Sequence, residues 1–254
     1  MRVRLISLAV VFLGWWVASL FGSDLTVPSP FLVAGNFIDL VVSGRLPSAL
    51  ALSLSALAIG GALSVVIGIP VGVLMGVRRS LAQAFEHYFS ALYVMPMSAI
   101  VPLLVLWFGF ELSSRVIFIL IFTVPQIVIT CYQGAKNIPV NLIEVARAFR
   151  ATDRQIFWKV IIPYEIPFIV TALRLGVGRA VQGMVVAELL LAGTRGLGFL
   201  IQIYSASLNL GMVLAVILFL MLLGVVFTGI VRRFEETIAP WRKGMVAELG
   251  TDHV

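Results

Sequence analysis

Long uncharged, apolar runs alternate with short charged segments along this chain of 254 residues. A helix needs about 20 apolar residues to cross the hydrocarbon core of a bilayer. Six runs reach that length, the fifth with charges inside it: 5–22, a part of 46–77, 88–110, 116–135, about 166–191, and a part of 196–231 that begins near residue 209. The pattern therefore predicts an all-α, polytopic membrane protein with six transmembrane helices.

Two of these runs are longer than one span. The run 46–77 holds thirty-two uncharged residues, and its first part, LPSALALSLS, is expected to lie along the membrane interface before the helix turns inward. The piece GLGFLIQIYSAS is expected to form a re-entrant or surface helix on the outer side, ahead of the sixth span. Gly68, Gly72 and Gly76 recur every four residues in the second span, which favours close approach of helix backbones.

The first run has two interpretations. A basic start, Met1 to Arg4, followed by eighteen uncharged residues resembles a signal peptide. The apolar run is longer than the usual signal core and leads into a hydrophobic protein, so we expect a retained first helix.

Composition agrees with the membrane assignment. The chain is 61% hydrophobic and 12% charged, and its mean hydropathy is +1.09. The pI near 10 would suggest nucleic acid as a partner of a soluble protein, but basic cytoplasmic loops explain it in a membrane protein. The single cysteine, Cys131, excludes an intramolecular disulfide and implies no metal cluster.

The basic residues orient the six spans. With both ends in the cytoplasm, the inner segments hold thirteen Lys and Arg residues and the outer segments hold three, namely Arg45, Arg115 and Arg195. Cytoplasmic loops carry the excess of positive charge in membrane proteins. We therefore expect a multi-pass protein of a bacterial cytoplasmic (inner) membrane with both termini inside, and the segment 136–162 lies in the cytoplasm.

That segment contains a polar insert, EVARAFRATDRQIFWKVIIP, at 144–163. Its pattern predicts two short helices, about 141–150 and 153–162, joined by a tight turn. Asn141 followed by Glu144, and Thr152 followed by Gln155, have the spacing of capping boxes. Asp153 in a first turn suits the helix dipole, and Pro163 is expected to end the second helix. The apolar residues of these two predicted helices are Val145, Ala146, Phe149, Ile156, Phe157 and Val160.

These apolar residues can dock on a partner, because aromatic and basic side chains together are typical of protein interfaces. The alternative is a loop that packs only on its own membrane domain. A helix-turn-helix that reads DNA does not fit an insert tethered to the bilayer at both ends.

The insert resembles the signature of binding-protein-dependent ABC transporter permeases. That signature reads Glu-Ala-Ala, three residues, Gly, nine residues, Ile, one residue, Pro, and it is matched here by Glu144, Ala146, Ile161 and Pro163. The stretches LYVMPMSAIVPLLVLWFGF and VVAELLLAGTRGLGFLI resemble the sulfonate, taurine and nitrate permeases of this family. The resemblance spans roughly 45–235 and implies a type I importer fold.

The resemblance also implies what the insert does. In this family it forms coupling helices, which sit in a groove of a cytoplasmic ATPase subunit and transmit its closure to the membrane helices. The implied contact and positioning residues are Glu144, Val145, Ala146, Phe149, Arg150, Ala151, Ile161 and Pro163.

One residue departs from the family pattern, because Arg150 stands where the family has glycine. Glycine adopts positive φ freely, whereas a left-handed arginine costs roughly 1 kcal/mol. We expect either different turn dihedrals or compensation by the cap at Thr152, and Arg150 could add a contact with the ATPase.

The fifth span carries Arg174, Arg179, Gln182 and Glu188, which is the one carboxylate that we expect deep in the membrane. Charges inside a span usually face the bundle interior or water. These residues are candidates for the translocation path, where an arginine would attract an anionic substrate, and the alternative is a structural ion pair with another helix or subunit. Met95, Met97 and Ser98 could line the path or belong to the core.

Catalytic motifs are absent from the sequence. It has no GxSxG elbow, no HExxH and no Walker loop. We therefore expect no enzyme, no catalytic residue, no metal site and no cofactor in this chain, with ATP and Mg²⁺ bound by a partner ATPase.

Together these features predict the permease subunit of an ABC importer, divided into an N-terminal helix with its outer loop (1–45), a permease core (46–235) and a cytoplasmic tail (236–254). The expected partners are an ATPase dimer, an extracytoplasmic substrate-binding protein, a second permease copy in a homodimer, and membrane lipid, with no nucleic acid. The subgroup suggests a small, anionic or vitamin-precursor-like substrate. The alternatives are a secondary transporter driven by an ion gradient and a membrane scaffold.

Overall fold

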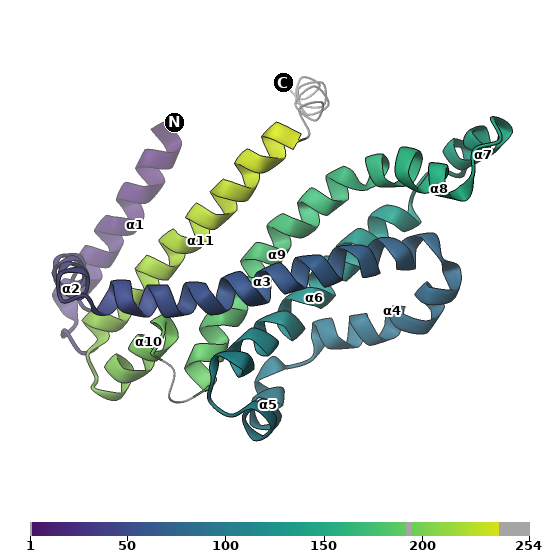
Figure 1. Cartoon of the computed structure of the whole chain (residues 1–254). Coiled ribbons are helices and arrows are strands. Elements are labelled where there is room, and N and C mark those ends of the chain that lie inside the picture. Colours follow the sequence, from purple (N-terminus) through teal and green to yellow (C-terminus); the bar gives the residue numbers. More distant parts are fainter. Residues whose placement is uncertain (1, 192–194, 239–254) are drawn as a thin grey trace.

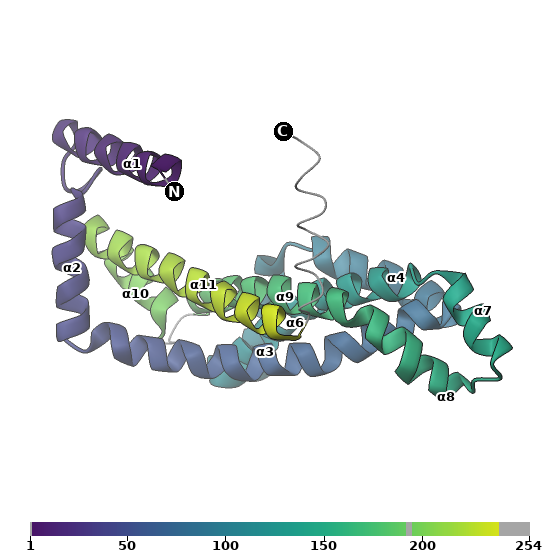
Figure 2. The same cartoon turned by 90° about the horizontal axis from the view of Figure 1, so that it is seen from above.

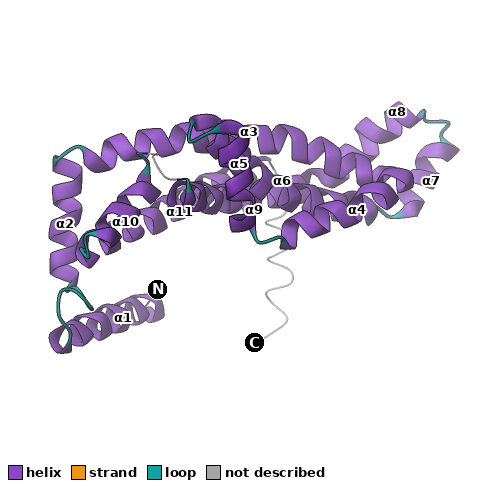
Figure 3. Cartoon of the chain, turned by 90° about the horizontal axis from the view of Figure 1, so that it is seen from below, coloured by secondary structure: helices purple, strands orange, loops and turns teal. Residues whose placement is uncertain are grey.

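The computed structural model describes residues 2–191 and 195–238, and every element in them is helical (Figures 1 and 3). The elements in chain order are α1 (Arg2–Phe21), α2 (Pro30–Val42), α3 (Arg45–Val77), α4 (Arg79–Val94), η1 (Met97–Ile100), α5 (Val101–Phe108), α6 (Leu112–Lys136), α7 (Val140–Ala148), α8 (Asp153–Ile156), η2 (Phe157–Ile161), α9 (Ile162–Leu190), α10 (Leu197–Ala206) and α11 (Leu210–Ile238). Of these, η1 is a 3-10 turn and η2 is a π-helical turn. The predicted all-α class is confirmed. The expected tail lies outside the described residues from 239 on.

Among the described residues, four helices are long and apolar enough to cross a membrane: α3, α6, the continuous helix Asp153–Leu190, and Leu210–Val231. A fifth span results if the bent pair Arg79–Val94 and Met97–Phe108 counts as one. The predicted number was six. The first predicted span, 5–22, coincides with α1 (Arg2–Phe21), of which Ala9–Phe21 is recorded as a shorter apolar helix.

α3 runs unbroken, which corrects the turn that we expected after its first part. Leu46, Ala49 and Ser53 are buried there, and the first two belong to a core that includes Leu197 of α10. One face of the start of α3 is therefore packed against protein, while Pro47, Ser48, Ala51 and Leu52 are exposed. At 1.5 Å per residue, its 33 residues extend about 50 Å, well beyond the ~30 Å hydrocarbon core.

The predicted third span, 88–110, is not one straight helix. α4 and the helical stretch that follows it are bent by 96°, and the bend lies at Met95 and Pro96. A residue before proline avoids the α conformation, and Met95 is extended, with ψ 134°. A charge-free run gives span length but does not reveal such a bend.

α2 occupies a segment that we expected to be an outer loop. The Ser29 side chain accepts a hydrogen bond from the Leu32 N–H at 3.2 Å, and Pro30 occupies the first helical turn, where its missing N–H costs nothing. The short helix expected ahead of the sixth span is confirmed as α10, and α11 begins at Leu210, beside the predicted start.

The centre of the bundle is formed by α3, α6 and α9 (Figure 2). The small residues of α3 face α6: a Cβ on Gly72 would lie 2.6 Å from the Val128 carbonyl oxygen, and one on Gly68 would lie 2.8 Å from Ile127 Cγ2. The predicted close packing is confirmed. α7 and α8 lie at one end of α3, whereas α2 and α10 lie at the other (Figures 1 and 2).

Candidate functional site

The polar insert forms a hairpin of α7 and α8 at one end of the bundle (Figure 1). Backbone hydrogen bonds close its turn, from the Arg150 N–H to the Arg147 oxygen at 2.8 Å and from the Ala151 N–H to the Ala146 oxygen at 3.1 Å. We call residues 140–161 the coupling hairpin. The short first helix, the tight turn and the start of the second helix at Asp153 are as predicted.

The second predicted capping box is present and the first is not. The Thr152 hydroxyl accepts from the Gln155 N–H at 3.3 Å, and the Gln155 side chain accepts from the Thr152 N–H at 2.8 Å. At the first helix Pro139 is the N-cap, with no side-chain hydrogen bond. Asn141 lies inside α7, because the helix begins one residue earlier than we predicted.

Arg150 adopts a left-handed backbone conformation, with φ 56°. Of the two expected alternatives, this is the left-handed turn in which arginine is unfavourable, and the Thr152 cap follows it directly.

We expect the Arg150→Gly variant to stabilise the hairpin by about 1 kcal/mol, because glycine removes the Cβ clash of the left-handed conformation. Hydrogen–deuterium exchange of the amides at 146–156 should slow by roughly fivefold. Ala148→Gly, in the helical arm beside it, is the matched control and should accelerate exchange. Equal acceleration in both variants would contradict the strain at Arg150.

One surface of the hairpin is packed and the other is exposed. Ile156 and Ile161 are 5% exposed and belong to a core with Ile143 and Ala146 against it. Phe149 at the turn is 84% exposed. The hairpin is therefore held on its own membrane domain while its tip presents an aromatic side chain outward.

The predicted contact residues divide between these two surfaces. Glu144, Val145, Phe149, Arg150 and Pro163 are exposed, Ala146 and Ala151 are half-buried, and Ile161 is buried. Ile161 thus cannot contact a partner directly, which corrects its place in the predicted contact set. Its role is to fix the second arm of the hairpin.

Pro163 does not end the second arm, contrary to our expectation. The helix continues from Asp153 to Leu190 through η2, a wider π-helical turn at Phe157–Ile161. Proline removes one backbone donor and crowds the carbonyl four residues earlier, and a π-helical turn places that carbonyl differently. One continuous helix therefore connects the hairpin with the membrane core.

Glu188 lies at the opposite end of α9 and is fully buried. Ser53 Oγ lies 2.7 Å and 2.9 Å from its two carboxylate oxygens, and the Gly198 N–H donates to one of them at 2.9 Å. Arg115 Nη1 is 3.7 Å from the other oxygen, and the Leu197 N–H donates to Ser53 at 2.9 Å. Glu188 thus joins α3, α6, α9 and the start of α10.

This geometry decides between the two predicted roles of Glu188. We expected it either to line the translocation path or to form a structural ion pair with another helix. Its pair with Arg115 of α6 agrees with the second alternative, and Ser53 and Gly198 also contact its oxygens. Glu188 is a structural anchor for α10. The sequence did not identify Ser53 or the backbone donors, because these groups are uncharged and do not stand out in an apolar run.

Glu165 was missed entirely. It is fully buried in α9 near its start, and neither carboxylate oxygen has a hydrogen-bond partner. Glu188 is therefore not the only deep carboxylate. Glu165 falls between the predicted insert and the predicted fifth span, whereas the continuous helix brings it into the packed bundle.

Arg179 is half-buried between two aromatic rings. Its guanidinium carbon lies 5.0 Å from the Tyr93 ring centroid and 4.5 Å from that of Phe122, and Nη2 donates to the Tyr93 carbonyl at 3.5 Å. A cation held over aromatic faces keeps its charge while it is partly shielded from water. Arg179 is therefore held by aromatic rings and a backbone carbonyl of α4 and α6.

The other path candidates do not gather at one point. Arg174 is half-buried, Gln182 and Ser98 are exposed, Met95 is half-buried, and Met97 is buried. Met97 belongs to the core with Leu104 and Phe118, as the packing interpretation predicted. Within residues 2–191 and 195–238, no three His, Cys, Asp or Glu side chains form a group that could hold a metal ion.

A family model described as "Binding-protein-dependent transport system inner membrane component" matches residues 68–240. The formylaminopyrimidine transport permease protein ThiX of Halalkalibacterium halodurans is 32% identical over 89% of this chain and 90% of its own length. The putative aliphatic sulfonates transport permease protein SsuC of Bacillus subtilis is 30% identical, over 92% and 85% respectively.

A solved structure has the same fold. It is an inward-facing conformation of the MetNI methionine ABC transporter, with a TM-score of 0.68 and 23% identity. The similarity covers 77% of this chain and 96% of the matched chain. The permease fold is thus common to both, at an identity that carries no information on substrate.

Proposed function

The chain belongs to the binding-protein-dependent transport system inner membrane components, which are ABC importer permeases, and we propose that its coupling hairpin transmits the closure of a cytoplasmic ATPase dimer to α9. The permease is not itself an enzyme, because ATP hydrolysis belongs to the partner ATPase. The observation that carries the proposal is the continuous helix Asp153–Leu190, which links the exposed hairpin to the centre of the bundle.

The surface of the hairpin supports docking rather than mere packing on its own domain. Phe149 is 84% and Val145 is 56% exposed, and Glu144 and Arg150 surround them with charge. Exposed aromatic and apolar side chains with a charged rim are the usual composition of a protein interface. A scaffold would need the same surface, but it would have no use for a rigid link to a membrane-spanning helix.

The proposed arrangement in the membrane follows from the two ends of the bundle. We place the coupling hairpin and both termini in the cytoplasm, according to the excess of basic residues there. α2 and α10 then face the outer side, where a binding protein delivers substrate. A second copy of the chain completes a two-fold permease, as expected for a homodimer.

We propose that the substrate is a small anion, of the sulfonate, taurine, nitrate or vitamin-precursor class, and that Arg179 provides positive potential along the path. The support is the fixed guanidinium between Tyr93 and Phe122 and the transport names of the relatives ThiX and SsuC. The test is ATP-dependent uptake into liposomes that contain the permease, its ATPase and its binding protein. Uptake driven by an ion gradient without ATP would contradict the proposal.

Arg179→Gln should lower uptake of an anionic substrate by at least about tenfold, since removal of one poorly solvated charge costs about 1.4 kcal/mol or more in binding or passage. Arg179→Lys should restore uptake only in part, because an ammonium ion does not stack on two rings as a guanidinium does. Capture of the ATPase should stay at the wild-type level in both variants. Unchanged uptake with unchanged assembly would contradict a role in the path.

A further inference from the structure

A pocket of about 500 Å³ lies between the C-terminal end of α3 and the coupling hairpin. Its size is typical of pockets that bind small molecules. Its lining combines apolar and charged side chains from the end of α3, α7, α8 and η2: Leu74, Val77, Arg78, Ile143, Arg147, Asp153, Arg154, Ile156, Phe157 and Ile161. Three arginines against one aspartate give this lining a formal charge of +2.

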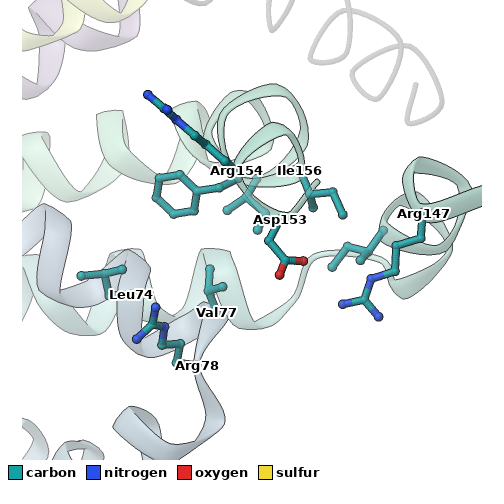
Figure 4. Close-up of a pocket in the computed structure, with 10 residues that line it drawn as sticks. Leu74, Val77, Arg78, Arg147, Asp153, Arg154 and Ile156 are labelled. Carbon is teal, nitrogen blue, oxygen red and sulfur yellow. The ribbon is translucent and has the colours of Figure 1, made fainter. Parts of the chain in front are cut away.

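The charged side chains approach the pocket from opposite sides. Figure 4 shows the Asp153 carboxylate between the guanidinium groups of Arg78 and Arg147, while the Arg154 guanidinium turns away. In the part of the chain that the structure describes, the ion pairs are Arg115 with Glu188 and Lys136 with Glu86. Asp153 therefore neutralises neither arginine by direct contact, and both guanidinium groups remain available to an anion.

Arginine suits phosphate oxygens, because its planar guanidinium donates two parallel hydrogen bonds. Apart from the three arginines and Asp153, the lining is aliphatic or aromatic, so the matching ligand carries an apolar part beside its phosphate. We propose that this pocket binds the phosphate of an anionic phospholipid from the cytoplasmic leaflet, with Arg78 and Arg147 as the phosphate ligands. Basic pockets beside membrane helices on the cytoplasmic side commonly have this ligand.

The position of the pocket favours lipid over a soluble phosphate. α3 ends at Val77 after a long apolar stretch, which places Arg78 where a membrane helix leaves the hydrocarbon. Trp158, next to the lining residue Phe157, is 61% exposed, and tryptophan is enriched at the headgroup level of membranes. A bound phosphate would also connect α3 with α7, so lipid would hold the hairpin against the bundle.

Retention of lipid by the purified full-length chain tests this proposal. The chain is delipidated in mild detergent, equilibrated with equal amounts of phosphatidylglycerol and phosphatidylcholine, and analysed by native mass spectrometry. We expect the wild type to prefer phosphatidylglycerol, and Arg78→Gln with Arg147→Gln to lower that binding by about thirtyfold, roughly fivefold for each arginine. Asp153→Asn should increase it by about fivefold.

Arg79→Gln is the matched control, since Arg79 is the exposed neighbour of Arg78 and does not line the pocket. Wild-type binding in the double arginine variant, or a loss of the same size in Arg79→Gln, would overturn the proposal. If the double variant folds poorly, Asp153→Asn still tests the proposal, because this variant is expected to bind more phosphatidylglycerol than the wild type. No preference for phosphatidylglycerol would also overturn the proposal.

A second arm separates the two sources of phosphate. Inorganic phosphate is titrated into the delipidated chain, and hydrogen–deuterium exchange is followed at Arg78 and Arg147. Protection by millimolar phosphate without any lipid preference would assign the pocket to a soluble anion and overturn the lipid proposal. Neither arm includes the ATPase or transport, so failure here is distinct from failure of the proposed coupling function.

Discussion

The variant Glu144→Arg with Ala146→Asp will abolish ATP-driven uptake while the permease still inserts and folds. Both positions lie on α7 of the coupling hairpin, Glu144 exposed and Ala146 half-buried. A reversed charge and a new carboxylate would each be buried without a partner against the ATPase, and a mismatch of this kind costs about 2–5 kcal/mol. Uptake into liposomes should therefore fall by at least about 100-fold.

The matched control places the same two new side chains elsewhere. Gln83→Arg with Ala84→Asp changes two exposed residues of α4, outside the hairpin, and should leave uptake within about twofold of the wild type. Equal loss in both variants would mean that the added charges harm insertion or folding. Retained uptake in the hairpin variant would remove the hairpin from the coupling mechanism.

Glu188→Ala will destabilise the chain more than any substitution on the hairpin. It leaves the buried Arg115 guanidinium without its ion-pair partner, 3.7 Å away in the wild type, and it removes the acceptor of the Gly198 N–H. Breaking a buried pair from one side costs about 3–5 kcal/mol. Thermal unfolding in detergent should shift down by roughly 10 °C.

The anchor can be separated from a role in transport by a second variant. Glu188→Leu combined with Arg115→Met removes both charges, and apolar replacement of a whole buried pair is often nearly neutral. We expect this variant to regain most of the lost thermal stability. If it unfolds as early as Glu188→Ala, the destabilisation does not come from the unpaired arginine, and the hydrogen bonds of Ser53 and Gly198 are then the stronger contribution.

Local rules predicted part of the hairpin. The Thr152 cap depends on a few neighbouring residues, so the sequence contains what determines it. The same holds for the small residues of α3, whose spacing of four places them on one helix face toward α6. The backbone conformation of Arg150 was left open between two alternatives, and the structure shows positive φ.

The errors arose where an element is decided by distant contacts. The charge-free run at 88–110 could not show the 96° bend, because the hydropathy of the residues carries no information on the direction of the helix axis. Pro163 was expected to end a helix, and η2 allows that helix to continue. One face of the start of α3 packs against α10, which lies about 150 residues later in the chain.

Buried polar residues were the hardest part of the site to predict. Glu188 was recognised by its charge, but its role depends on Ser53 of α3 and on two backbone N–H groups of α10. Glu165 lies between the predicted insert, 144–163, and the predicted fifth span, about 166–191, and was given no role. The sequence thus identified Arg174, Arg179 and Glu188 of α9 by their charge, whereas the contacts of Glu188 required the three-dimensional packing.

Co-purification tests the central claim most directly. The chain is expressed with its candidate ATPase, solubilised in mild detergent and captured through a tag on the permease. Coupling through the hairpin predicts that the wild type and Gln83→Arg with Ala84→Asp retain the ATPase, while Glu144→Arg with Ala146→Asp loses it. A well-folded wild-type permease that captures no ATPase, or a hairpin variant that captures as much as the wild type, would contradict the claim.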